Sequence, residues 1–343
     1  MPEEARRKII SVNTKSAPAD KNSKIASQWL ANNKQIIGIL VVLVVLSLFF
    51  SVFSDSFATT GNMLNMLQQL AANLIVCVFM TLVITTSGID LSVGSILSLA
   101  SALIAVLLKA GLGSFEAFLI VLVIGAIAGL INGVVISYLS IPPFIVTLAS
   151  MIYIQGLALL VTGGYSIGIE GSAWLNAIGQ GRIVNIPVSA IIAIIIVILG
   201  WSILTQTRFG TYVIGIGSNE ESVRRSGVNI KKIKMLTYMF SGMAASFAGI
   251  VLATRLGSGS SNVGTGFEME VIAAVVLGGT SLFGGIGTML GSVFGVFLIG
   301  VIDNGLTLMN VSPYIIQIIQ GSVLLLAVIV NTHVFSGKSL KRR

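Results

Sequence analysis

Long, continuous apolar runs separated by short polar segments make up most of the chain. Runs of about twenty apolar residues predict membrane-crossing helices, whereas a β-barrel would show shorter segments of alternating polarity. The pattern therefore predicts an all-α, polytopic membrane protein with about ten transmembrane helices. The runs lie at 36–53, 63–86, 92–109, 115–138, 143–162, 186–205, 235–254, 268–282, 287–303 and 312–331.

Composition excludes a water-soluble fold. Of the 343 residues, 55% are hydrophobic and only 9% are charged, and the mean hydropathy is +0.99. Soluble domains carry about a quarter charged residues, so this chain lacks the polar side chains to cover a surface in water. The 38 glycines, with a Gly-x-x-x-Gly spacing at Gly125 and Gly129, favour helices that pack closely.

The basic residues indicate topology rather than nucleic-acid binding. Of the 20 Lys and Arg residues, seven lie in 1–35, six in 206–235 and four in 338–343. Six predicted spans separate the first cluster from the second, and four separate the second from the third. Both numbers are even, so all three clusters fall on one side, which the positive-inside rule assigns to the cytoplasm. Both termini are thus expected in the cytoplasm.

The same pattern divides the chain into three parts. A basic cytosolic tail is expected at 1–35, a transmembrane domain at 36–331 with a cytosolic loop at 206–234, and a basic cytosolic tail at 332–343. The run at 268–282 is short and ends in several glycines, which predicts a half-helix or a re-entrant element.

Weak internal similarity predicts two inverted halves of five spans each. The segment 85–95 matches 278–288 at two positions, and Ile131-Asn132-Gly133 resembles Asp303-Asn304-Gly305.

Asp90 is the only ionised group among residues 56–108. A carboxylate that faces lipid is costly, so a partner or a helix end must accommodate it. The surrounding glycines allow the backbone to break, and the nearby serines allow capping of an exposed helix terminus. We expect Asp90 to cap the third span, while contact with a passing solute or with an unidentified charge stays open. The residues expected at a helix break or translocation path are Ser87, Gly88, Asp90, Ser92, Gly94, Asn132 and Asn304.

The cytosolic loop 206–234 contains a predicted short helix. Ser218 and Glu221 have the spacing of a capping box, and Gly227 suits a left-handed helix end. A helix of about two turns is marginal alone, so it is expected to dock on a cytosolic partner, the alternative being a solvated loop. The candidate docking residues are Ser218, Asn219, Glu220, Glu221, Arg224, Arg225 and Gly227.

Enzymatic and metal sites are not indicated. The single cysteine, Cys77, lies in an apolar run and the single histidine, His333, follows the last span, so no metal site built on these ligands is expected. The segment 337–339 reads Gly-Lys-Ser, but Thr332 stands where a phosphate-binding loop requires its first glycine. No nucleophile and base converge either, so no cofactor is expected and any ATP must be hydrolysed by another chain.

Several motifs together resemble one family, the permeases of ribose-type ABC monosaccharide importers, in the superfamily with branched-chain amino-acid permeases. The resemblance covers about 36–331. It implies a permease that forms a homodimer or a pseudo-symmetric heterodimer, with cytosolic ATP-binding subunits and an extracytoplasmic sugar-binding protein. It also implies that 36–331 is a permease domain and that 206–234 is its coupling loop, with a coupling helix around 219–227. The motifs are GIDLSVGS at 88–95, GLING at 129–133, RFGTY at 208–212, GIGSN at 215–219, SGVN at 226–229, VLGGTSLFGGIGT at 276–288 and DNG at 303–305.

One feature departs from the family. Charged residues follow Asn219 where the family often has small apolar ones, which indicates that charge sets the choice of ATPase partner.

The sequence therefore predicts the permease of a bacterial plasma-membrane ABC importer for a ribose-like pentose, a hexose or a related polyol. A neutral solute is favoured because a charged one needs a compensating partner. The alternatives are a nucleoside or branched-chain amino-acid permease of the same superfamily, or an ion-coupled secondary transporter. Hydroxyls and amides that could line the path belong to Ser87, Ser92, Ser95, Asn132, Asn304, Gln317 and Gln320.

Overall fold

The computed structural model describes residues 34–170 and 173–339, so residues 1–33 of the expected N-terminal tail and the last four residues lie outside the described part. Twelve α-helices and four two-residue strands make up its regular structure. The helices are α3 (Lys34–Phe53), α4 (Thr60–Thr85), α5 (Val93–Lys109), α6 (Ser114–Tyr138), α7 (Pro143–Thr162), α8 (Ala173–Gln180), α9 (Val188–Gln206), α10 (Arg208–Arg225), α11 (Ile230–Leu256), α12 (Phe267–Leu277), α13 (Met289–Leu308) and α14 (Pro313–Ser339). The strands are β1 (Ile167–Gly168), β2 (Arg182–Ile183), β3 (Ile186–Pro187) and β4 (Ser258–Gly259).

Each of the ten predicted apolar runs coincides with a helix. Within the described residues, seven helices are long and apolar enough to cross a membrane, while α5 and the apolar part of α14 are shorter. The expected half-helix at 268–282 is confirmed as α12, which has 11 residues. At 1.5 Å per residue it covers roughly 16 Å, about half of a bilayer's hydrocarbon core. The chain is a polytopic helical membrane protein.

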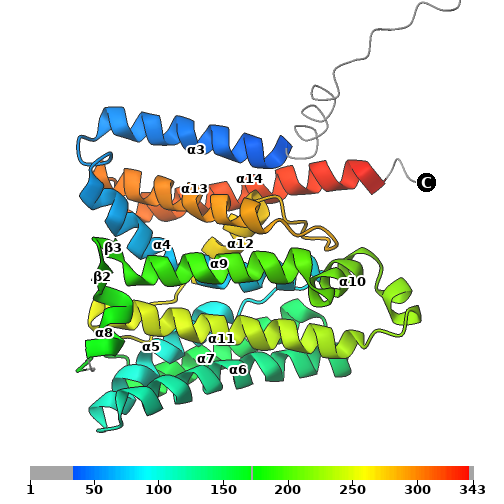
Figure 1. Cartoon of the computed structure of the whole chain (residues 1–343), viewed down its shortest axis with the longest axis horizontal. Helices are drawn as coiled ribbons and strands as arrows, with labels where there is room; N and C mark the ends of the chain where they lie inside the picture. Colours follow the sequence, from blue (N-terminus) through cyan, green and yellow to red (C-terminus); the bar gives the residue numbers. More distant parts are fainter. Residues whose placement is uncertain (1–33, 171–172, 340–343) are drawn as a thin grey trace, which may run out of the picture.

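The long helices run side by side along the length of the molecule (Figure 1). The short helix α8 and the hairpin β2–β3 lie at one end. At the other end lie α10, the beginning of α3 and the end of α14. The three helix ends beside the basic segments thus share one end of the bundle, as the even span counts predict.

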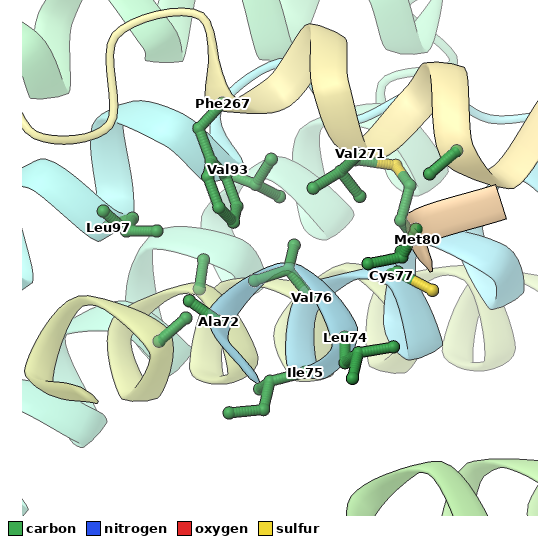
Figure 2. Packing of buried hydrophobic residues seen from close by; sticks show 14 of the residues in the cluster. Ala72, Leu74, Ile75, Val76, Cys77, Met80, Val93, Leu97, Phe267 and Val271 are labelled. Carbon is green, nitrogen blue, oxygen red and sulfur yellow. The ribbon is translucent and has the colours of Figure 1, made fainter. Parts of the chain in front are cut away.

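Helix α4 occupies the centre of the bundle. In its most apolar 18-residue stretch 72% of the residues are buried, compared with 11% in α3, which lies at the rim. In Figure 2, Phe267 of α12 and Val93 of α5 point toward the face of α4 that carries Val76. Cys77, also on α4, is fully buried in this cluster. The core is therefore built where two short helices meet one long helix.

The order of elements occurs twice along the chain. A long helix, an interruption, a short helix and two long helices appear as α4–α7 and again as α11–α14. Helix α5 packs on α11, whereas α12 packs on α4, so each short helix contacts the long helix of the other half. The carbonyl of Thr85 accepts a hydrogen bond from Gly285 N at 2.9 Å and lies against Gly217 of α10. Thus α4 ends at the end of the bundle where α11 begins, which supports the expected inverted halves.

The repeat corrects one of the sequence alignments. In the order of elements the interruption 86–92 corresponds to 257–266, between α11 and α12, and not to 278–288. The resemblance of Asn132 to Asn304 does fit the repeat, because these residues lie on the equivalent helices α6 and α13. Strands β1 and β4 pair antiparallel and join the connection after α7 to the interruption after α11.

Polar side chains satisfy the interruption 278–288, which separates α12 from α13. Asn331 of α14 is 3% exposed and donates to Thr280 O at 2.9 Å. Thr288 donates its hydroxyl to Gly278 O at 2.6 Å. Backbone groups that leave a helix inside a membrane protein need such internal partners, because lipid offers none.

Glycines set the close packing of α6 against α11. A side-chain carbon at Gly129 would meet the backbone carbonyl of Tyr238, and one at Gly242 would meet the carbonyl of Gly125. Because these neighbours are backbone atoms, they cannot rotate away. The predicted role of the Gly125 and Gly129 spacing in helix packing is thus confirmed.

We expect Gly129→Ala to destabilise the protein by about 1–3 kcal/mol, because the added methyl group forces α6 and α11 apart. Thermal unfolding in detergent measures the effect as a lower Tm. The matched control is Gly156→Ala in α7, where a Cβ has nothing within 4 Å. A Tm for Gly129→Ala equal to that of the control variant contradicts the prediction.

Candidate translocation path and coupling helix

Asp90 is fully buried in the interruption between α4 and α5. One carboxylate oxygen accepts hydrogen bonds from the backbone N–H of Ser92 at 3.0 Å and from the Ser92 hydroxyl at 2.6 Å. The other accepts from the Ser241 hydroxyl of α11 at 2.8 Å. Among the described residues no Lys or Arg forms an ion pair with it. The carboxylate is therefore held by hydroxyls and by the turn in front of α5.

The chain re-enters the bundle to place this carboxylate. Ser241 is twelve residues into α11, counted from Ile230, which is roughly 16 Å along its axis. Asp90 thus lies beside the middle of a long helix. Ser87, with φ 63°, begins the fold-back.

A polar network extends from Asp90 to two further helices. Asn132 of α6 donates to the Ser92 hydroxyl at 2.9 Å, and Ser150 of α7 donates to the Asn132 side-chain oxygen. Thr147 of α7 donates to the carbonyl of Ile89 at 3.2 Å. Three of the predicted residues, Asp90, Ser92 and Asn132, therefore meet in one buried cluster.

The other predicted path residues lie elsewhere. The Ser87 hydroxyl donates to Phe283 O at 2.8 Å. Gly88 lies against the hydroxyl of Tyr238, and Gly94 lies against Glu268. Ser87, Gly88 and Gly94 therefore make packing contacts at the interruption between α4 and α5.

Asn304 belongs to a different part of the bundle. Its side-chain amide exchanges two hydrogen bonds with that of Asn62, at 2.8 and 3.0 Å. Asn62 lies in the first turn of α4, away from the fold-back. Asn304 is thus separate from the network around Asp90.

A second polar cluster was not singled out from the sequence. Asn73 of α4 donates to Glu270 of α12 at 3.2 Å. Gln69 of α4 and Gln320 of α14 each donate to Asp303 of α13 at 3.4 Å. The sequence signal was the spacing of Gln69 and Asn73, which puts two amides on one face of an apolar helix.

A pocket of about 330 Å³ adjoins this cluster. Its wall is mainly apolar, with Glu270, Gln317 and Gln320 supplying polar groups. The predicted Gln317 and Gln320 are therefore brought together, but away from Asp90. The lining residues are Thr265, Gly266, Met269, Glu270, Ala273, Ile299, Ile302, Gln317, Gln320, Gly321, Val323 and Leu324.

The coupling loop contains more helix than predicted. Helix α10 begins at Arg208, and its buried Gly210, Val213 and Ile216 pack against the bundle. The helix is interrupted at Asn219, where φ is −161° and ψ is 94°. A short helical segment then continues to Arg225, and Gly227 adopts the predicted left-handed conformation with φ 79°.

The predicted capping box is wrong in its capping residue. The Asn219 side chain accepts the backbone N–H of Ser222 at 3.0 Å and so caps the short segment. The Ser218 hydroxyl instead donates back to Ile214 O at 2.9 Å, because Ser218 still belongs to the preceding helix. Asn is as good an N-cap as Ser, so the two residues competed on equal terms.

The charges of the short segment form ion pairs at the surface. Glu221 pairs with Arg224 and with Arg225, the latter at 3.0 Å. Glu220 pairs with Lys234 of α11 at 2.7 Å. Exposed pairs of this kind contribute little to stability, on the order of 0–1 kcal/mol. The charges therefore remain available to a partner surface.

A family model described as "Branched-chain amino acid transport system / permease component" matches residues 62–328. The chain belongs to this permease family. It is 39% identical over 306 residues to the ribose import permease protein RbsC of Escherichia coli K12, which covers 88% of this chain and 94% of the relative.

Other relatives in the permease family carry related names. The ribose import permease RbsC of Bacillus subtilis is 39% identical over 87% of this chain and 92% of its own length. The galactofuranose transporter permease YtfT of Escherichia coli K12 is 34% identical over 93% of this chain and 95% of its own length. No solved structure matches the chain.

We expect Asp90→Asn to be tolerated and Asp90→Leu to destabilise the permease. Asn keeps an acceptor for Ser92 and offers a donor to Ser241, whereas Leu leaves buried hydroxyls unpaired at about 1–3 kcal/mol each. Thermal unfolding in detergent compares the two variants. Equal losses of Tm for Asn and Leu contradict this account and show that the charge itself is required.

Proposed function

We propose that the chain is the membrane-spanning subunit of an ATP-binding-cassette importer for a neutral monosaccharide. The observation that carries the proposal is the match over nearly the whole chain to relatives named as ribose and galactofuranose permeases. A third relative, named as the galactose/methyl galactoside permease MglC of Salmonella typhimurium, is 35% identical over 92% of this chain. A monosaccharide as the transported solute is the feature that the three names have in common.

The polar clusters favour a neutral polyol over an amino acid. An amino acid carries an ammonium and a carboxylate, and each needs a compensating charge in a low dielectric. The clusters at Asp90 and Glu270 contain carboxylates, amides and hydroxyls, and among the described residues no basic side chain is hydrogen-bonded to either carboxylate. Such groups exchange hydrogen bonds with sugar hydroxyls. Of the alternative solutes, a branched-chain amino acid has support from the description of the family model alone, and a nucleoside is named by none of the relatives reported above.

We infer that the path runs past both clusters. The predicted residues at the break, namely Ser87, Gly88, Asp90, Ser92, Gly94 and Asn132, would shape the path from one side. Asn304, toward the end of the bundle where α4 begins, would shape it from the other. Weak hydrogen bonds suffice here, because tight binding in a channel slows release.

The energy source is proposed to be another chain. ATP-binding subunits in the cytosol would dock on the short segment after Asn219, using Ser218, Asn219, Glu220, Glu221, Arg224, Arg225 and Gly227. An extracytoplasmic binding protein would deliver the sugar at the end that carries α8. A second permease, identical or pseudo-symmetric, would complete the transporter in the bacterial inner membrane, with both termini in the cytoplasm.

We expect proteoliposomes that contain the permease, its ATP-binding subunits and the binding protein to accumulate radiolabelled ribose or a hexose only when ATP is supplied. Filtration uptake assays measure this, with labelled leucine as the competing solute. Uptake driven by a proton gradient without ATP identifies an ion-coupled carrier instead. Leucine uptake without sugar uptake would contradict the proposed monosaccharide and identify an amino acid as the solute.

Docking by charge is tested with the triple variant Glu221→Lys, Arg224→Glu and Arg225→Glu. This variant keeps opposite charges at the same spacings within the segment but reverses the charges shown to a partner. We expect it to insert normally and to lose co-purification with the ATP-binding subunits.

The matched control for docking is Arg182→Glu in strand β2, at the end of the bundle far from α10. It should co-purify with the ATP-binding subunits like the unaltered protein. Undiminished co-purification of the triple variant argues against a docking role for these charges.

A further inference from the structure

We call the short helical stretch from Asn219 to Arg225 the docking segment. Three backbone segments that are distant in sequence meet at one point beside it. They are the end of α4, the last residues of α10 before its interruption, and the loop between α12 and α13. We call this contact the coupling junction. Its members are Thr85, Ser87, Gly217, Ser218, Phe283, Gly284 and Gly285.

Hydrogen bonds tie the three segments together. Gly285 N donates to Thr85 O at 2.9 Å, and the Ser87 hydroxyl donates to Phe283 O at 2.8 Å. The Ser218 hydroxyl lies 3.4 Å from Gly285 O, a longer contact. The loop after α12 is thus bonded to the end of α4 and touches α10.

Glycines allow the three backbones to approach. A Cβ on Gly217 would collide with Thr85 O and Gly285 N, and a Cβ on Gly284 would collide with the Ser87 side chain. Gly284 and Gly285 also have φ of 82° and 76°, a region that other residues rarely adopt. The contact is therefore rigid, because backbone groups cannot yield as flexible side chains do.

The coupling junction lies between the docking segment and the two helix interruptions. Gly217 and Ser218 stand directly before Asn219, where the docking segment begins. Thr85 and Ser87 lead into the fold-back that carries Asp90, and 283–285 lie inside the interruption between α12 and α13. The docking segment is therefore joined, through Gly217 and Ser218, to contacts at both helix interruptions.

We propose that the coupling junction transmits movement of the docking segment to both helix interruptions at once, so that its residues position the path for ATP-driven transport. This inference rests on the proposed function. Rigid elements in direct contact carry such coupling when they move as whole bodies between two arrangements. A packing contact without this role would affect stability alone.

The test measures ATP hydrolysis and sugar uptake by the same assembled importer in proteoliposomes. We expect Ser87→Ala and Gly217→Ala to retain assembly, ATP hydrolysis and the sugar concentration for half-maximal uptake, with a lower Tm for Gly217→Ala because its Cβ meets backbone atoms. The number of ATP molecules hydrolysed per sugar imported should rise at least about fivefold in both variants. A lost contact between Ser87 and the solute would instead change the sugar concentration for half-maximal uptake. The control is Gly156→Ala in α7, where the added Cβ has nothing within 4 Å. It should keep the ratio of the unaltered importer.

Two results overturn the proposal. One is an unchanged ratio in Ser87→Ala, which removes a hydrogen bond and adds no bulk. The other is a parallel fall of hydrolysis and uptake in both variants together with a lower Tm, which indicates a purely structural contact. Failure of the unaltered importer to couple ATP to sugar uptake refutes the proposed function instead, so the two failures are distinguishable.

Discussion

A backbone that stops being helical inside a membrane protein must find hydrogen-bond partners within the protein, and much of this structure follows from that requirement. In the interruption before α5, the Asp90 side chain accepts the backbone N–H of Ser92, and Thr147 of α7 donates to the carbonyl of Ile89. The interruption after α12 is satisfied by Asn331, which reaches from α14, and by Thr288. A charged residue in one half and a neutral amide in the other thus perform the same physical task.

Interrupted helices are short, and short helices must be enclosed. Helix α12 and helix α5 each lie against the long helix of the opposite half, so the two halves interlock through their short helices. The glycines of α6 and α11 complete the enclosure by bringing backbones together. In lipid, where apolar burial between helices contributes little, such close packing is the main source of cohesion.

The sequence predicted the elements better than their depth. Apolar runs located ten helices, and the glycine-rich end of 268–282 predicted the half-helix, because length and composition act locally. The first part of α10 falls within the predicted coupling loop. Its glycines and polar residues give a weak helix signal, and the helix is stabilised by packing against the bundle. The depth of Asp90 and the meeting of Glu270 with Asn73 depend on where distant helices cross, which no local pattern encodes. At the docking segment Ser218 and Asn219 are adjacent and are equally good N-caps, and the packing of the preceding helix leaves Asn219 as the cap.

The environment of Cys77 has a practical consequence. It is the single cysteine of the chain, and its side chain is fully enclosed between α4 and its neighbours. A water-soluble thiol reagent applied to the folded protein should therefore leave the native chain unlabelled. Any cysteine introduced at an accessible position would then report its own environment without background, and conformations of the importer could be followed in an otherwise natural sequence.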